Sequence, residues 1–137
     1  MARILALDFG KVRTGIAVTD ELQLIASGLT TVNTNELIPF LKDYLAKEQV
    51  AHIVVGEPKQ MDGTASKSET LISSFLEKLK KAIPNIPIIR QDERFTSKLA
   101  VQSMLEGGLK KKKRQNKALV DEISATLILQ AYLDRKL

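Results

Sequence analysis

The sequence predicts an α/β protein whose mixed five-stranded sheet begins as an antiparallel meander, continues with parallel strands and is flanked by helices. The first third of the chain holds apolar segments of period two, separated by short polar turns. The remainder alternates short apolar runs with segments of helical period, which is typical of parallel βα units. With 137 residues, 44% of them hydrophobic, we expect one domain over residues 1–137.

The meander consists of three expected strands joined by tight turns. These strands cover residues 3–9, 14–19 and 23–31. The turns lie at residues 10–13 and at Asp20-Glu21. Because side chains alternate along a strand, Ile4, Ala6 and Asp8 share one face of the first strand.

Helical and extended patterns alternate through the rest of the chain. Asn33 or Thr34 is the expected N-cap of the first helix, and Ser66 with Glu69 forms a capping box for the second. The expected elements are a helix over 35–49, a strand over 51–58, a helix over 66–82, a strand over 86–93, a short helix from Thr96 or Ser97 to Gly107-Gly108, and a helix over 117–134.

Composition narrows the function classes. The absence of cysteine excludes disulfides and thiolate metal sites. No apolar run is long enough for a membrane span, and Asp8 interrupts the first apolar stretch, so we expect a cytoplasmic protein without a membrane partner. A net charge of +5 favours nucleic acid as partner. The lack of tryptophan and the low aromatic content disfavour a single-strand binder built on stacking aromatics.

Two carboxylates fall where core residues are expected. Asp8 continues the inward face of the first strand, where an ionised group is costly unless it is paired. Asp121 shares a helical stripe with Ala125, Ile128 and Tyr132. The alternatives are that Asp8 only caps a turn and that Asp121 only interacts with the helix dipole.

A third acidic cluster follows the fifth expected strand. Asp92 and Glu93 are adjacent and point to opposite faces, so at most one of them joins Asp8. Ends of parallel strands are where α/β sheets place their sites. Three carboxylates without Cys or His favour Mg²⁺ or Mn²⁺, and a pair of such ions clamps a phosphodiester for attack by water. The alternative is a solvated loop in which Arg94 pairs locally.

Basic residues accompany these acids. We expect them to contact phosphates, although a charge run is also typical of a solvated loop. They are Lys11, Arg13, Arg94, Lys110, Lys111, Lys112, Lys113 and Arg114. The lone histidine, His52, precedes a strand and is expected to be structural rather than a metal ligand.

Four blocks of the sequence resemble the YqgF family of RuvC-like Holliday junction resolvases and pre-16S rRNA nucleases. The blocks are "LDFGKVRTGIAVTD", "IVVGEPKQMDGT", "DERFTSKLA" and "VDEISATLILQAYL", and they span nearly the whole chain. The resemblance implies a ribonuclease H-like fold and a metal-dependent nuclease. It also implies a role in maturing the 5′ end of pre-16S ribosomal RNA, with resolution of branched DNA as the alternative.

The resemblance also implies site residues. The catalytic and metal-binding acids are Asp8, Glu93 and Asp121. In the resolvases proper the middle acid ends the fourth strand, where this chain has Gly56-Glu57, so Glu57 and Asp92 are the alternatives to Glu93. The remaining motif matches are Gly10, Arg13, Gly15, Pro58, Asp62 and Gly63.

Two other functions fit parts of the pattern. The first block also resembles the phosphate loop of actin-like and sugar-kinase ATPases, in which Asp8 holds Mg²⁺–ATP, but those proteins need a second similar domain. A module that has lost catalysis is the other alternative, binding RNA or a ribosome-assembly factor through its basic face. The sequence leaves monomer and dimer equally open.

Overall fold

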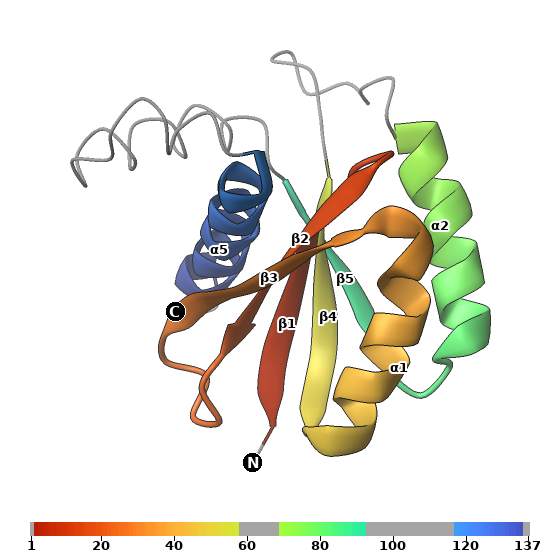
Figure 1. Cartoon of the computed structure of the whole chain (residues 1–137). Helices are drawn as coiled ribbons and strands as arrows, with labels where there is room; N and C mark the ends of the chain where they lie inside the picture. The colour runs from red at the N-terminus through yellow and green to blue at the C-terminus, as the bar shows by residue number, and fades with distance from the viewer. Residues whose placement is uncertain (1, 58–68, 93–116, 136–137) are drawn as a thin grey trace.

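A five-stranded sheet with helices on both faces forms the frame of the protein (Figure 1). The computed structural model describes residues 2–57, 69–92 and 117–135. The strands are β1 (Arg3–Asp8), β2 (Arg13–Thr19), β3 (Ala26–Asn33), β4 (Val50–Glu57) and β5 (Ile88–Asp92). The helices are η1 (Thr34–Glu36), a 3₁₀ turn, α1 (Leu37–Lys47), α2 (Glu69–Ala82) and α5 (Lys117–Arg135). None of the helices in these ranges combines the length and hydropathy of a membrane span.

The sheet order β3-β2-β1-β4-β5 confirms the predicted mixed sheet. β1 pairs antiparallel with β2 and parallel with β4, and β5 pairs parallel with β4. β1 is therefore central, and its carboxyl end lies at the same edge of the sheet as the carboxyl ends of β4 and β5. This edge is the expected location of a site in an α/β sheet.

Alternation along β1 divides the core into two layers. Leu5 and Leu7 are fully buried beneath α1 and α2. Ile4 and Ala6 are fully buried beneath α5, on the opposite face of the sheet (Figure 1). Asp8 follows Ala6 at the same spacing, so its side chain belongs to the α5 face.

The hairpin between β2 and β3 differs from the prediction. The expected strand over 23–31 is wrong at its start, since β3 begins at Ala26. The Asp20 carboxylate accepts hydrogen bonds from the backbone N–H groups of Leu22, Leu24 and Ile25 at 2.8–3.2 Å. Together with the positive φ of Gln23 (60°), these bonds stabilise a turn, and the strand begins only after this turn.

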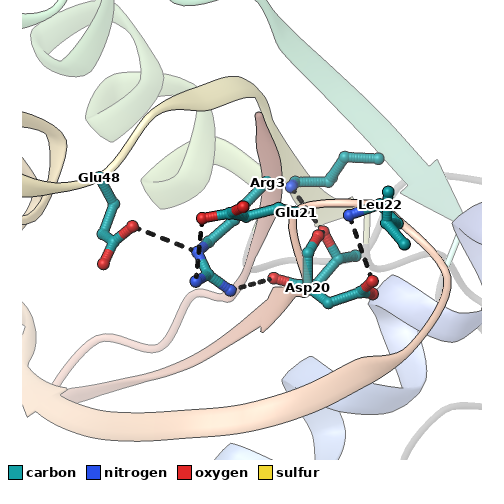
Figure 2. Close-up of polar contacts among 7 residues, drawn as sticks. Arg3, Asp20, Glu21, Leu22 and Glu48 are labelled. Atoms are coloured by element: carbon teal, nitrogen blue, oxygen red, sulfur yellow. Dashed lines mark hydrogen bonds and ion pairs between the residues drawn. The ribbon is translucent and has the colours of Figure 1, made fainter. Parts of the chain in front are cut away.

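Arg3 ties this hairpin to the end of α1, at the amino end of β1 (Figure 2). Its guanidinium lies 3.4 Å from the Glu48 carboxylate and 4.0 Å from that of Glu21. It also donates to the Thr19 carbonyl at 3.0 Å. These contacts fix the edge of the sheet that is opposite to the carboxyl end of β1.

The start of the first helix also differs from the prediction. Neither Asn33 nor Thr34 caps the helix through its side chain, and α1 covers Leu37–Lys47 rather than 35–49. The Thr34 hydroxyl donates instead to the Gly10 carbonyl at 2.6 Å, and it is hydrogen-bonded to the Thr14 hydroxyl at 2.9 Å. Thr34 therefore fastens the β1–β2 turn to η1.

The later helices agree with the prediction where the structure describes them, whereas β5 begins at Ile88 rather than at residue 86. α2 ends at Ala82 and α5 begins at Lys117, as expected. Glu69, assigned to a capping box, pairs with Arg90: the guanidinium donates to both carboxylate oxygens at 2.7 and 3.0 Å. Ser66 and the short helix expected over 96–108 lie outside the described residues.

Candidate active site

Asp8 ends β1 as a half-buried carboxylate on the face covered by α5. Burial raises the pKa of its carboxyl to about 7, and the negative charge of Asp121 contributes to the same shift. The ordinary pKa of this carboxyl is 3.8, so the shift marks Asp8 as a poorly solvated acid that senses the charge of a second acid. Such perturbed acids are typical of functional sites.

Gly15 explains how Asp121 comes so close. Gly15 pairs with Asp8 across the β1–β2 ladder. A Cβ atom at this position would overlap the backbone carbonyl of Asp121, so a glycine is required for α5 to lie directly on β2. Further along the same stripe of α5, Ala125 and Ile128 are fully buried and hold the helix against the sheet.

Arg13 forms an ion pair with Asp121 at the mouth of the site. Its Nε donates to Asp121 Oδ2 at 2.8 Å, and the two side chains are 36% and 22% exposed. Arg13 stands two residues before Gly15 on the same face of β2, which explains this contact. The Arg13 guanidinium, for which the sequence predicts phosphate binding, therefore also pairs with the Asp121 carboxylate. Its outer part is exposed to solvent.

The two alternative middle acids lie on the other face of the sheet. Glu57 pairs with Asp92 across the parallel β4–β5 ladder. Val55, two residues before Glu57, packs in the core beneath α1 and α2. By alternation Glu57 and Asp92 belong to that face, away from Asp8.

Gln91 is a site-facing residue that the sequence prediction missed. It pairs with Gly56, and both belong to the α5 face, because the preceding pair on that face, Val54 and Ile89, packs in the core beneath α5. Gln91 is buried, and its Oε1 has no hydrogen-bond partner among the residues that the structure describes. Its signal in the sequence is a polar residue at an inward position of an apolar strand.

Several predicted site residues fall outside the described ranges. They are Glu93, Arg94, Lys110, Lys111, Lys112, Lys113, Arg114, Pro58, Asp62 and Gly63. Within residues 2–57, 69–92 and 117–135, no group of three or more acidic or histidine side chains is arranged to hold a metal ion. Lys11 is exposed in the turn after Asp8. His52 packs edge-on against the Tyr132 ring, with centroids 5.4 Å apart, as a structural histidine does.

Comparison with protein families shows which family this chain belongs to. The family model for RuvX, described as Holliday junction resolvase, matches residues 2–135. The chain belongs to this family. The family and the relatives of this chain are named as resolvases and nucleases. The activity class is therefore phosphodiester hydrolysis, and the substrate is a nucleic acid. The prediction of a nuclease of the YqgF type is confirmed.

Relatives similar over their whole length support the assignment. A "putative pre-16S rRNA nuclease" of Christiangramia forsetii is 66% identical over 133 residues, covering 97% of this chain and 98% of that protein. The protein of the same name from Flavobacterium psychrophilum is 59% identical over 137 residues, covering all of both chains. The RuvX chain thus matches these relatives from end to end.

Solved structures share the fold at low sequence identity. T. thermophilus RuvC in complex with a Holliday junction substrate superposes with a TM-score of 0.58 at 18% identity, covering 99% of the RuvX chain and 96% of RuvC. The fowlpox virus Holliday junction resolvase gives a TM-score of 0.53 at 13% identity, covering 97% and 99% of the two chains. These similarities confirm the predicted ribonuclease H-like fold.

Proposed function

We propose that this RuvX protein is a metal-dependent nuclease that trims the 5′ end of pre-16S ribosomal RNA. The observation that carries the proposal is the pair Asp8 and Asp121: burial raises the pKa of Asp8 to about 7, the charge of Asp121 adds to that shift, and Gly15 lets the α5 backbone at Asp121 lie directly on β2. Two acids kept in mutual repulsion lower the stability of the fold, and bound cations relieve that repulsion. Resolution of branched DNA is the alternative, since the family model and the solved neighbours carry resolvase names.

The donor set fits a hard divalent cation. Carboxylate and amide oxygens suit Mg²⁺ and Mn²⁺, and the α5 face offers Asp8, Asp121 and the unpaired Oε1 of Gln91. When bound, such an ion supplies Lewis-acid activation of the phosphodiester and of the attacking water. We assign Asp8 and Asp121 as its ligands.

Glu93 is proposed as the third acid. The two alternatives, Glu57 and Asp92, belong by alternation to the α2 face of the sheet, which favours the residue that follows Asp92. Glu93 itself lies outside the described residues.

The basic residues are assigned to the substrate strand. Arg13 orients the Asp121 carboxylate through its Nε and presents the exposed part of its guanidinium to a phosphate. Lys11, in the turn after Asp8, adds a second cation at the same edge. Arg94 and the cluster from Lys110 to Arg114 are proposed to extend this surface, with ribosome-assembly factors as expected partners in the cytoplasm.

Cleavage of two substrates in parallel tests the proposal. A 5′-labelled pre-16S RNA fragment and a four-way DNA junction are incubated with Mg²⁺ or Mn²⁺ under single-turnover conditions. We expect cleavage of the RNA by the wild type, its loss in Asp8→Asn and Asp121→Asn with RNA binding retained, and its loss in Glu93→Gln. The matched control Glu57→Gln, on the other face, should cleave within about twofold of the wild type.

Three outcomes contradict parts of this assignment. Cleavage of the junction alone would make branched DNA the substrate. Loss of cleavage in Glu57→Gln with full activity in Glu93→Gln would exchange the middle acid. RNA binding without cleavage of either substrate by either ion would favour the binding module.

A further inference from the structure

A groove opens on the other side of the strand that carries Asp8. Its volume is about 480 Å³, within the range of small-ligand sites. It lies between the end of β1, the start of α1 and the first turns of α2, and Phe9 follows Asp8 directly. Since Asp8 faces α5 and Phe9 faces α1 and α2, the two acids and the groove flank one strand end.

The floor of the groove is aromatic and aliphatic. The rings of Phe9 and Phe75 stack with centroids 4.6 Å apart and planes at 26°. Phe75 is buried, whereas Phe9 is half-buried and lines the opening. Ile38 and Leu71 complete the apolar lining, and Leu71 is 48% exposed although it is a large hydrophobic residue. This surface can take a flat apolar group.

The rim of the groove is basic and polar. Lys11 and Lys78 line it and are exposed, and no described residue of the lining is acidic. The side chains of Asn35 and Ser74 also line the groove and make no hydrogen bond within the described part of the chain. An amide and a hydroxyl beside an apolar floor can bind the edge of a base, and two lysines can bind phosphates.

We propose that this groove is a nucleotide subsite that holds one unpaired nucleotide of the substrate strand next to the scissile phosphate. The base lies on Phe9 and Leu71, its edge meets Asn35 or Ser74, and Lys11 and Lys78 hold the adjoining phosphates. The proposal rests on the proposed nuclease function and deepens it. It assigns the enzyme a requirement for a single-stranded nucleotide beside the cut.

Charge complementarity selects this occupant. A purely apolar peptide would leave both lysines without a partner, and free phosphate would leave the apolar floor exposed. A nucleotide satisfies both the floor and the rim, because it combines a π-face with negative charge. The basic character of the whole chain, at +5, agrees with this polarity.

Binding of a short RNA without metal tests the subsite independently of cleavage. The probe is a single-stranded RNA pentanucleotide with 2-aminopurine at its centre, titrated in EDTA and followed by fluorescence and by ¹H–¹⁵N NMR. We expect quenching of the fluorophore and amide shifts centred on Asn35, Leu71 and Ser74. Leu71→Asp and Lys78→Glu change exposed side chains and should each weaken binding by about fivefold or more.

Lys80→Glu is the matched control, since it makes the same charge change on the other side of α2, where Lys80 lines a separate surface with Arg90. It should weaken binding by less than about twofold. Equal affinities for the wild type, Leu71→Asp and Lys78→Glu, no binding of the pentanucleotide, or shifts that avoid the groove would overturn the subsite.

The two proposals fail in different ways. If the pentanucleotide binds in the groove as described but no substrate is cleaved with Mg²⁺ or Mn²⁺, the nuclease assignment fails and the groove remains a nucleotide-binding site without a role in cleavage. If RNA is cleaved and Leu71→Asp and Lys78→Glu leave both KM and kcat unchanged, the subsite fails and the nuclease stands.

Discussion

Neutralising Asp8 should stabilise the metal-free protein at alkaline pH, although it removes a proposed catalytic group. Asp8 is half-buried beside Asp121, and its pKa is raised from 3.8 to about 7. Between these two pH values the native state retains a proton that the unfolded chain has released. The free energy of unfolding therefore falls as pH rises through this window.

The magnitude follows from the two pKa values. Each pH unit within the window lowers the free energy of unfolding by about 1.4 kcal/mol, so the full penalty above pH 7 is about 4 kcal/mol. Asp8→Asn has no proton to lose at this position. Between about pH 5 and about pH 8.5, the wild type should lose about 3 kcal/mol more than the variant.

Urea unfolding in EDTA at these two pH values provides the measurement. All other titrating groups are common to the two proteins, so most of their contributions cancel in the comparison. Addition of Mg²⁺ at the higher pH should restore much of the wild-type stability and little of the variant's. If the stability difference between wild type and Asp8→Asn is the same at both pH values, Asp8 is not a strained carboxylate and the reasoning is refuted.

Three further substitutions probe the surroundings of the site. Gly15→Ala should cost about 1–3 kcal/mol in urea unfolding and about 100-fold in single-turnover cleavage, because its Cβ displaces the α5 backbone at Asp121. Gly28→Ala should cost less than about 1 kcal/mol, because its Cβ meets only the flexible Glu122 side chain; equal costs at both glycines would contradict the packing argument. Glu69→Gln should cost about 1–3 kcal/mol at pH 7, since the Arg90 hydrogen bonds lower the pKa of Glu69. That stability is present above the ordinary pKa of 4.5 and is lost as pH falls through the lowered native pKa, so an unfolding difference independent of pH would refute it.

Much of the fold follows from periodicity alone. The alternation in β1 predicts two core layers, and the helical stripe of α5 predicts which side of that helix is buried. Only the structure shows that α5 covers the layer of Ile4 and Ala6. The start of β3 could not be predicted from periodicity, because it depends on three backbone N–H groups that donate hydrogen bonds to the Asp20 carboxylate. Side-chain capture of a turn competes with a strand and leaves little trace in the hydrophobic pattern.

The site divides in the same way. Period-two and period-3.6 patterns place Asp8 and Asp121 on inward faces, and the structure brings them to one face of the sheet. The contact of Arg13 with Asp121 depends on how closely α5 approaches β2, which only the packing at Gly15 reveals. The position of Gln91 on the α5 face can be recognised only once the β4–β5 register is known.

The groove could not be predicted from the sequence, for a related reason. The low aromatic content argued against a protein that stacks several bases, and that argument still applies to long single strands. One nucleotide needs only one small platform. Phe9 and Phe75 form that platform from two elements far apart in the sequence, so neither residue signals it alone.

Mn²⁺ binding by isothermal titration calorimetry tests most directly the claim that Asp8 and Asp121 form one cation site. The comparison includes the wild type, Asp8→Asn, Asp121→Asn and the control Glu57→Gln on the opposite face of the sheet. Each substitution at the pair should weaken Mn²⁺ binding by at least about tenfold, and the control by less than about twofold. Wild-type affinity in Asp121→Asn would contradict the account, because α5 would then contribute nothing to the ion.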